Sequence, residues 1–202
     1  MNVFSSPILL PDAQSILEPS MPRLVEAMVE SWRVWREDYR AQHVVLDETT
    51  RAMIVNRNWY WNVAQKVGEA DGVRFGDDNH QRFVVVKDTL IMRFKFLGRQ
   101  LEAHNYPTPR AQDWERQTSL PDFPRVARLN FGYRLDSTGT RIKDAFVTLP
   151  NGIKDVVNDW VWQIWGSPLD RDTFGIQLRF PPKLGESAAV YAWEDYSTRY
   201  GT

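Results

Sequence analysis

The sequence predicts an α+β fold in which N-terminal helices precede a mostly antiparallel β-sheet of about five to seven strands. Apolar residues recur at helical spacing over residues 20–72, and from residue 82 they alternate with polar residues, which is the period of a strand. We divide the chain into an N-terminal arm, residues 1–19, and a single α+β domain, residues 20–202. That domain has a helical part over residues 20–72 and a sheet part over residues 82–200.

The helical part begins after a segment without a clear period. Residues 1–19 contain three Pro residues, which indicates an arm. Ser20 followed by Pro22 is typical of a helix start, because Ser caps free amides and Pro fits the first turn. This helix is predicted to end near Tyr39. A second helix begins at residues 47–50 and ends at Gly68, and residues 69–81 are polar and turn-rich, which predicts a loop.

The sheet part begins with a predicted hairpin. Residues 82–86 and 89–97 are strand-like and flank Lys87 and Asp88. A short helix is expected next, capped by Thr108. Further strands are predicted over residues 125–135, 141–149, 156–165, 174–180 and 189–196, with a turn at Asn151 and Gly152.

The strand over residues 89–97 contains two cations in an otherwise apolar run. Alternation places Arg93 and Lys95 on one face and the core residues on the other, namely Leu90, Met92, Phe94 and Phe96. If residues 125–135 form the neighbouring strand, the basic face also includes Arg128, Asn130 and Arg134. The sequence leaves three interpretations of this face open: it is exposed to solvent, it binds a protein partner, or it binds nucleic acid. In a further alternative the N-terminal helices cover it, and the cations pair with Glu26, Glu30 or Glu37.

Composition excludes several classes of protein. The chain has no Cys, so disulfide scaffolds, thiolate zinc sites and cysteine nucleophiles are excluded. No apolar stretch approaches the roughly 20 residues of a membrane span, and residues 1–14 lack the basic start of a secretory signal. We therefore expect a cytoplasmic protein without membrane contact. The net charge is −1, but residues 81–145 hold 12 bases and 7 acids, a net of +5, which favours an anionic partner.

Common catalytic motifs are absent from the sequence. It contains no phosphate-binding glycine loop, dinucleotide fingerprint, zinc-protease motif or hydrolase nucleophile elbow. No Lys has an acid two residues before it, as a two-metal nuclease of the restriction-enzyme type requires. We predict no cofactor and leave enzymatic activity open, with a non-enzyme favoured.

Two weaker patterns remain as alternatives. Asp77, Asp78, Asn79 and His80 offer oxygen ligands and an imidazole to a divalent ion, although a solvated turn is the ordinary explanation and we assign no metal site. His104, or His80, is an alternative acid–base residue of a metal-free nuclease, with Arg93 or Lys95 stabilising phosphate charge. Single histidines are more often ordinary surface or packing residues.

Three stretches, residues 89–97, 105–124 and 129–152, carry a family resemblance. In this order "TLIMRFKFL", "NYPTPRAQDWERQTSLPDFP" and "LNFGYRLDSTGTRIKDAFVTLPNG" resemble a family of bacterial and prophage proteins. The genes of that family lie near helix-turn-helix regulators and metallopeptidases of the ImmA/IrrE type. The resemblance covers roughly residues 50–165 and implies a toxin–antitoxin, phage-defence or regulatory setting. It supplies no catalytic residues.

The sequence therefore predicts a non-catalytic protein-interaction component of a bacterial or phage toxin–antitoxin, defence or regulatory system. The alternative is a nucleic-acid-binding protein or metal-free nuclease that uses the basic face. An enzyme acting on a small metabolite is a third possibility without a supporting motif. The predicted binding residues are Arg93, Lys95, Arg128, Asn130 and Arg134. Because interfaces are enriched in Trp, further candidates are Trp59, Trp61, Trp160 and Trp162.

Overall fold

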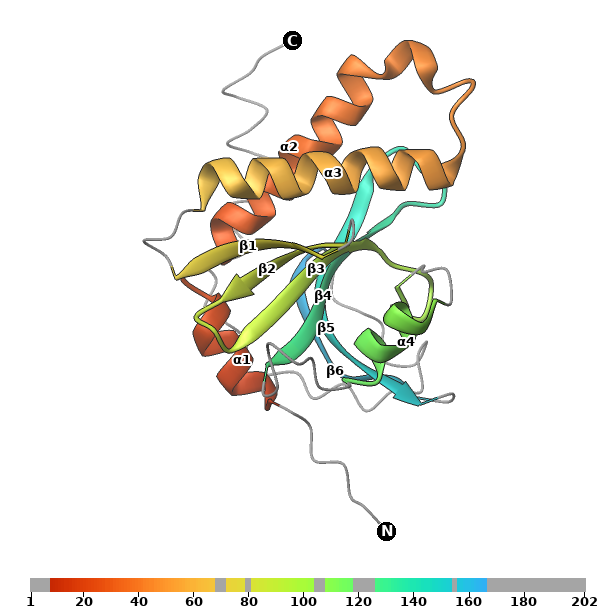
Figure 1. The fold of residues 1–202 in the computed structure, drawn as a ribbon. Coiled ribbons are helices and arrows are strands. Elements are labelled where there is room, and N and C mark those ends of the chain that lie inside the picture. Colours follow the sequence, from red (N-terminus) through yellow and green to blue (C-terminus); the bar gives the residue numbers. More distant parts are fainter. Residues whose placement is uncertain are drawn as a thin grey trace.

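The computed structural model of the chain describes residues 8–67, 72–78, 81–103, 108–117, 126–153 and 156–166. The first elements are helical, namely α1 (Leu10–Leu17), α2 (Met21–Asp38), the 3-10 helix η1 (Arg40–Gln42) and α3 (Glu48–Lys66) (Figure 1). The sheet part comprises β1 (Val73–Asp78), β2 (Gln81–Val86), β3 (Leu90–Phe96), α4 (Pro109–Glu115), β4 (Ala127–Leu135), β5 (Ile142–Ile153) and β6 (Val156–Trp165). This order confirms the predicted α+β class. None of the described helices is both long and apolar enough to cross a bilayer.

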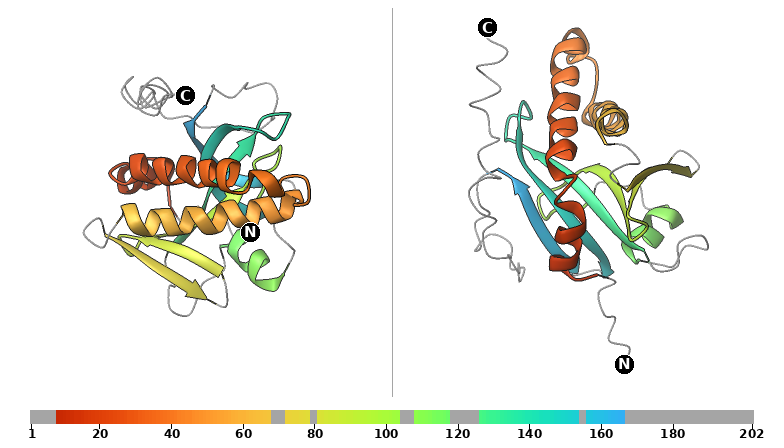
Figure 2. Two further views of the ribbon diagram at one scale, coloured as in Figure 1. Left: turned by 90° about the horizontal axis from the view of Figure 1, so that it is seen from above. Right: turned by 90° about the vertical axis from the view of Figure 1, so that its left-hand side faces the viewer.

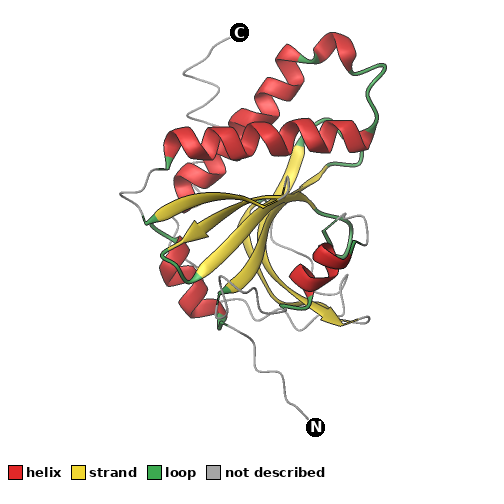
Figure 3. Cartoon of the chain, in the orientation of Figure 1, coloured by secondary structure: helices red, strands yellow, loops and turns green. Residues whose placement is uncertain are grey.

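The strands of the described part form one six-stranded sheet in sequence order, β1-β2-β3-β4-β5-β6. Every neighbouring pair is antiparallel except β3 and β4, which run parallel. A parallel pair requires a crossover connection, and here that connection contains α4. The helices α2 and α3 cover one face of the sheet, whereas α4 lies against the other (Figures 2 and 3).

The main core lies between the N-terminal helices and the first face of the sheet. On α3, Val55, Trp59 and Val63 recur every four residues and are fully buried. The helix begins where the Asp47 carboxylate accepts a hydrogen bond of 2.7 Å from the Thr50 amide, an N-cap. The predicted core side of β3 faces these helices and is confirmed by the burial of Leu90, Met92 and Phe94.

The N-terminal segment differs from its prediction. Residues 10–17, predicted to belong to an arm because they show no clear period, form α1. Leu10, Ala13 and Leu17 of this helix are buried in the main core. The Trp160 indole N–H donates a hydrogen bond of 3.1 Å to the carbonyl of Ile8, which fixes the segment against β6. Residues 8–17 therefore pack against the body of the fold.

The first strand also differs from its prediction. The loop predicted over residues 69–81 is wrong for Val73–Asp78, which form β1 and pair with β2. Val73 is buried, and the Phe75 ring contacts the Tyr60 ring edge-on at 5.5 Å. Gly76 suits this strand because a Cβ there would lie 2.2 Å from the Phe83 ring. Packing against α3 thus overrides the turn-forming composition.

The predicted turns at Lys87–Asp88 and at residues 136–140 agree with the structure, whereas the turn predicted at Asn151 and Gly152 does not. Lys87 and Asp88 have φ values of 48° and 53°, in the left-handed region that tight hairpin turns use, and the β2–β3 hairpin is confirmed, with Val86 paired to Leu90. The turn at Asn151 and Gly152 is misplaced, because β5 continues through both and its Ile153 pairs with β6. The strands predicted over residues 174–180 and 189–196 lie outside the described residues.

Candidate functional site

The predicted binding residues lie on the sheet face that points away from α2 and α3, which we call the second face. Arg93 on β3 pairs in register with Asn130 on β4, and Asn130 pairs with Thr148 on β5. These three polar side chains therefore form a row across neighbouring strands, which lie about 4.8 Å apart. The sequence alternation correctly placed Arg93 and Asn130 on one face.

The second face is not the solvated surface that was one of the sequence-based expectations. Arg93 is 4% exposed and Asn130 is 1% exposed. The alternative in which N-terminal acids cover and neutralise this face is also wrong. Glu26 pairs with Lys66, and Glu30 and Glu37 pair with an arginine of their own helix.

Two short segments cover the ends of the second face. At one end Trp114 of α4 packs on Val85 and Ile91 of the β2–β3 hairpin. At the other end, residues 97–103 cover β5 and β6, with a small cluster formed by Leu97, Leu101, Phe146 and Val161. Gly132 permits this approach, because a Cβ there would lie 2.3 Å from the Leu97 side chain. The polar row therefore lies between two apolar contacts.

The position of α4 is set by polar contacts at both of its ends. The predicted cap is confirmed, since the Thr108 hydroxyl accepts a hydrogen bond from a backbone amide in the first turn. After the helix, the Gln117 side chain bonds the backbone N–H and C=O of Arg128 and the carbonyl of Pro150. Gly152 makes room for this helix end, because a Cβ there would lie 2.8 Å from the Arg116 backbone. The helix is therefore fixed to β4 and β5.

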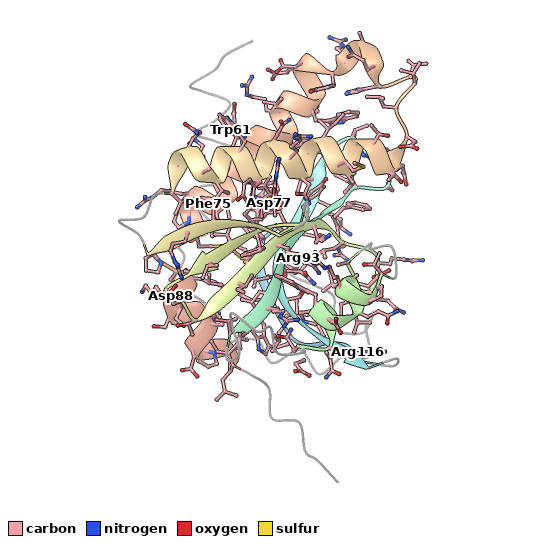
Figure 4. The ribbon with its side chains drawn as sticks, in the orientation of Figure 1. Trp61, Phe75, Asp77, Asp88, Arg93 and Arg116 are labelled. Atoms are coloured by element: carbon pink, nitrogen blue, oxygen red, sulfur yellow. The ribbon has the colours of Figure 1, made fainter. Side chains whose placement is uncertain are left out.

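Trp114 lies close to two guanidinium groups. The guanidinium carbon of Arg93 is 3.8 Å from the centre of a Trp114 ring, and that of Arg128 is 5.9 Å from it. Cations over an aromatic face are attracted by its negative charge density. Arg128 Nη1 also donates to the carbonyl of Asp113 at 2.6 Å, in the last turn of α4, where the helix dipole favours a cation. Figure 4 shows Arg93 on the side of the sheet that faces α4.

Several polar atoms of this cluster are buried without a hydrogen-bond partner. Among the described residues they include Arg93 Nε and Nη2, Arg128 Nε, Asn130 Oδ1 and Thr148 Oγ1. Buried polar groups are normally satisfied, and an unsatisfied one costs about 1–3 kcal/mol. This concentration of unsatisfied polar atoms in and beside the polar row requires a physical or functional explanation.

Burial weakens the charged forms of the cations on the second face. It lowers the pKa of Arg93 to about 9 and that of Lys95 to about 8, and it also lowers the pKa of Arg128. The charge of Arg93 further lowers the pKa of Lys95, whereas the carboxylate of Glu115 opposes both shifts.

The depressed pKa of Lys95 predicts that the fold gains stability in mild alkali. Between about pH 8 and pH 10.5 the unfolded chain keeps this proton and the folded chain has lost it, so the free energy of unfolding rises with pH. We expect a gain of at most about 2 kcal/mol between pH 7 and pH 9.5. Urea unfolding of the parent protein and of Lys95→Met over this range measures it. An equal pH dependence in both proteins would contradict the assignment.

Arg134, the fifth predicted residue, lies four residues beyond Asn130 on β4 and has its own partner. Its Nε and Nη2 donate to the two carboxylate oxygens of Asp144 at 2.7 and 2.5 Å. The guanidinium group also lies 5.1 Å from the centre of the Phe146 ring. Arg134 is therefore committed to a buried ion pair on the second face.

The structure adds little support for a catalytic histidine or for a metal site at residues 77–80. Asp77 is exposed and lies 3.5 Å from Arg82, while the side chains of Asp78 and His80 and all of His104 lie outside the described residues. Within the described ranges no group of three or more His, Cys, Asp or Glu side chains is suitably placed for a metal ion. His43 stacks on Trp35, with ring centres 4.4 Å apart.

Of the four tryptophan candidates, one is accessible. Trp59, Trp160 and Trp162 are buried in the core, but Trp61 on α3 is 65% exposed. Together with Met53 and Arg57 it forms an exposed row at four-residue spacing. We call these three residues the α3 stripe. Residues two apart on a helix point about 200° apart, so a sequence pattern that buries Trp59 also predicts the exposure of Trp61.

Comparisons with protein-family models, with curated proteins and with solved structures gave no match.

Proposed function

We propose that the chain is a non-catalytic protein-interaction component of a bacterial or phage toxin–antitoxin, defence or regulatory system. The genetic setting in this proposal depends on the resemblance carried by residues 89–97, 105–124 and 129–152. We further propose the α3 stripe as the partner-binding surface. The observation that supports it is the exposure of Trp61 and Met53 on the outer side of α3, at 65% and 68%.

The composition of the α3 stripe suits a protein interface. Trp, Met and Arg are enriched in interfaces, and Trp and Arg supply many of their strongest contacts. Val44 and Val45, in the connection that precedes α3, are also exposed, at 93% and 78%. Clustered exposed apolar residues are costly in water and commonly mark contact sites. Figure 4 shows Trp61 directed away from the sheet.

The α3 stripe favours an amphipathic helix of another protein. Its residues follow one side of a helix at positions i, i+4 and i+8, which is the spacing that helix-in-groove and helix-pair contacts use. Arg57 lies between the two apolar residues, and within the described part of the chain it makes no ion pair. An acidic residue among the apolar positions of the partner helix would complement this charge.

Loss of binding on changing the α3 stripe tests the proposal. Trp61→Ala should weaken binding to an isolated stoichiometric partner about 30-fold, since an interface hot spot contributes about 2 kcal/mol or more. Arg57→Glu should weaken it as well. Affinity capture from the host, followed by titration of the purified partner, gives both values.

The matched control is Arg36→Ala, which changes an exposed residue of α2. It should bind as the parent does. A partner that binds Trp61→Ala and Arg57→Glu with parental affinity would exclude the α3 stripe as its contact surface.

The nucleic-acid alternative has weaker support. Phosphate contacts need cations that the backbone of a nucleic acid can reach from solvent. Arg93 and Arg128 are buried and so do not supply this surface. Recovery of nuclease-sensitive material whose affinity falls steeply with salt would favour this alternative instead.

A further inference from the structure

We propose that Arg93 and Arg128, which both lie near Trp114, form a buried binding site for the oxyanion group of a small molecule, a phosphate or a carboxylate. This site lies on the second face of the sheet and is separate from the α3 stripe, so it goes beyond the proposed function. The ligand class follows from the donors that the fold leaves unpaired.

The unpaired atoms of Arg93 match two oxygens of one anion. Nε and Nη2 lie on the same edge of the planar guanidinium group, and both are buried without a partner. This edge donates two parallel hydrogen bonds to a carboxylate or phosphate in the usual fork geometry. The Trp114 ring covers the face of the group at 3.8 Å but leaves the in-plane N–H bonds unsatisfied. Stacking on the ring thus orients the arginine, but it does not supply the hydrogen-bond acceptors that an anion would supply.

Arg128 supplies a second donor to the same region. One of its nitrogens is occupied by the carbonyl of Asp113, whereas its Nε is buried and unpartnered. Its guanidinium carbon lies within 5.9 Å of the centre of a Trp114 ring, as does that of Arg93. Two cations held against one aromatic side chain repel each other, and an anion between or beside them relieves that repulsion.

The polar row extends the site across the sheet. Asn130 lies beside Arg93 in register, and Thr148 lies beside Asn130, each with an unpartnered buried oxygen. The Thr148 hydroxyl donates or accepts, so it suits either an anion oxygen or a hydroxyl of the same ligand. A ligand that carries an oxyanion and an adjacent polar group would satisfy the row.

Thermal unfolding with defined anions tests the site. Inorganic phosphate and acetate are added separately to the full-length protein, with sodium chloride at equal ionic strength as the reference. An anion at about ten times its Kd should raise Tm by about 4 °C in a saturable way. A rise with phosphate alone assigns a phosphate ligand, and a rise with acetate alone assigns a carboxylate ligand.

Variants distinguish a site from general ion effects. Arg93→Met should abolish the saturable rise and is expected to fold, because it replaces a buried unpaired charge with an apolar side chain. Arg93→Lys keeps the charge but loses the fork, and should weaken anion binding at least about tenfold. Arg36→Met removes an exposed arginine of α2 and should retain the parental rise.

Two results would overturn the proposal. One is the absence of a saturable rise with either anion in the parent protein. The other is an equal rise in the parent and in Arg93→Met. Direct titration of phosphate or acetate by calorimetry gives the same comparison without depending on unfolding.

Discussion

Replacing Trp59 with Ala should lower the free energy of unfolding by about 3–5 kcal/mol, the largest effect we expect from a single core substitution. Most single domains have a total of about 5–15 kcal/mol. The variant should therefore unfold at a clearly lower temperature, by roughly 6–20 °C for a chain of this size. Urea titration and thermal melts followed by circular dichroism measure both quantities.

The size of this effect follows from the contacts of Trp59. The side chain is fully buried and stacks on Phe94, with ring centres 4.5 Å apart, and it meets Phe131 edge-on at 4.7 Å. Its indole N–H donates to the carbonyl of Leu24 on α2 at 3.2 Å. Trp59 therefore joins α2 and α3 to the middle of the sheet, and its loss leaves a large cavity there.

Trp61 gives a matched control two residues further along α3. Because Trp61 is mostly exposed, Trp61→Ala should change stability by no more than about 0.5 kcal/mol. Similar destabilisation by the two substitutions would contradict the orientation of α3 described above. The same pair separates the two roles of tryptophan on this helix, since Trp59 serves folding and Trp61 is proposed to serve binding.

The regular parts of the fold could be predicted because their periods are local. Alternation along β3 gave the correct core side for Met92 and Phe94, and the dipeptide at Lys87 and Asp88 marked the hairpin. The strand β1 was missed because Gly76 and neighbouring acids are typical of turns, and its pairing with β2 depends on packing against α3. The helix α1 was missed because three Pro residues and its short length conceal its period.

The burial of the second face could not be predicted from strand alternation. Alternation tells which residues share a face, but not which face a distant segment covers. Here the cover comes from α4 and residues 97–103. Two glycines carried part of the missing signal, since Gly132 and Gly152 are the places where Leu97 and Arg116 approach the sheet. Neither glycine is identifiable as a close contact without the partner segment.

The second large effect is expected at the buried ion pair. Asp144→Ala should lower the free energy of unfolding by about 3–5 kcal/mol, because it leaves Arg134 without its counter-charge on a covered face. Asp144 is 2% exposed, and both of its carboxylate oxygens accept from Arg134. Equilibrium unfolding in urea at pH 7 measures the loss.

A double substitution shows whether the loss of stability in Asp144→Ala comes from the lost ion pair or from the charge of Arg134 left unpaired. Replacing both partners, Arg134→Met with Asp144→Leu, removes the unpaired charge and should recover most of the stability, since an apolar pair of similar volume often equals or exceeds a buried ion pair. Measured against the single variants Arg134→Met and Asp144→Leu, the coupling energy between the two sites should then be at least about 3 kcal/mol. Additive losses in the double variant would mean that Asp144 and Arg134 act separately. Recovery would instead show that folding does not require the ion pair on this part of the second face. Arg93 differs, because an apolar substitution there is expected to abolish anion binding without lowering stability.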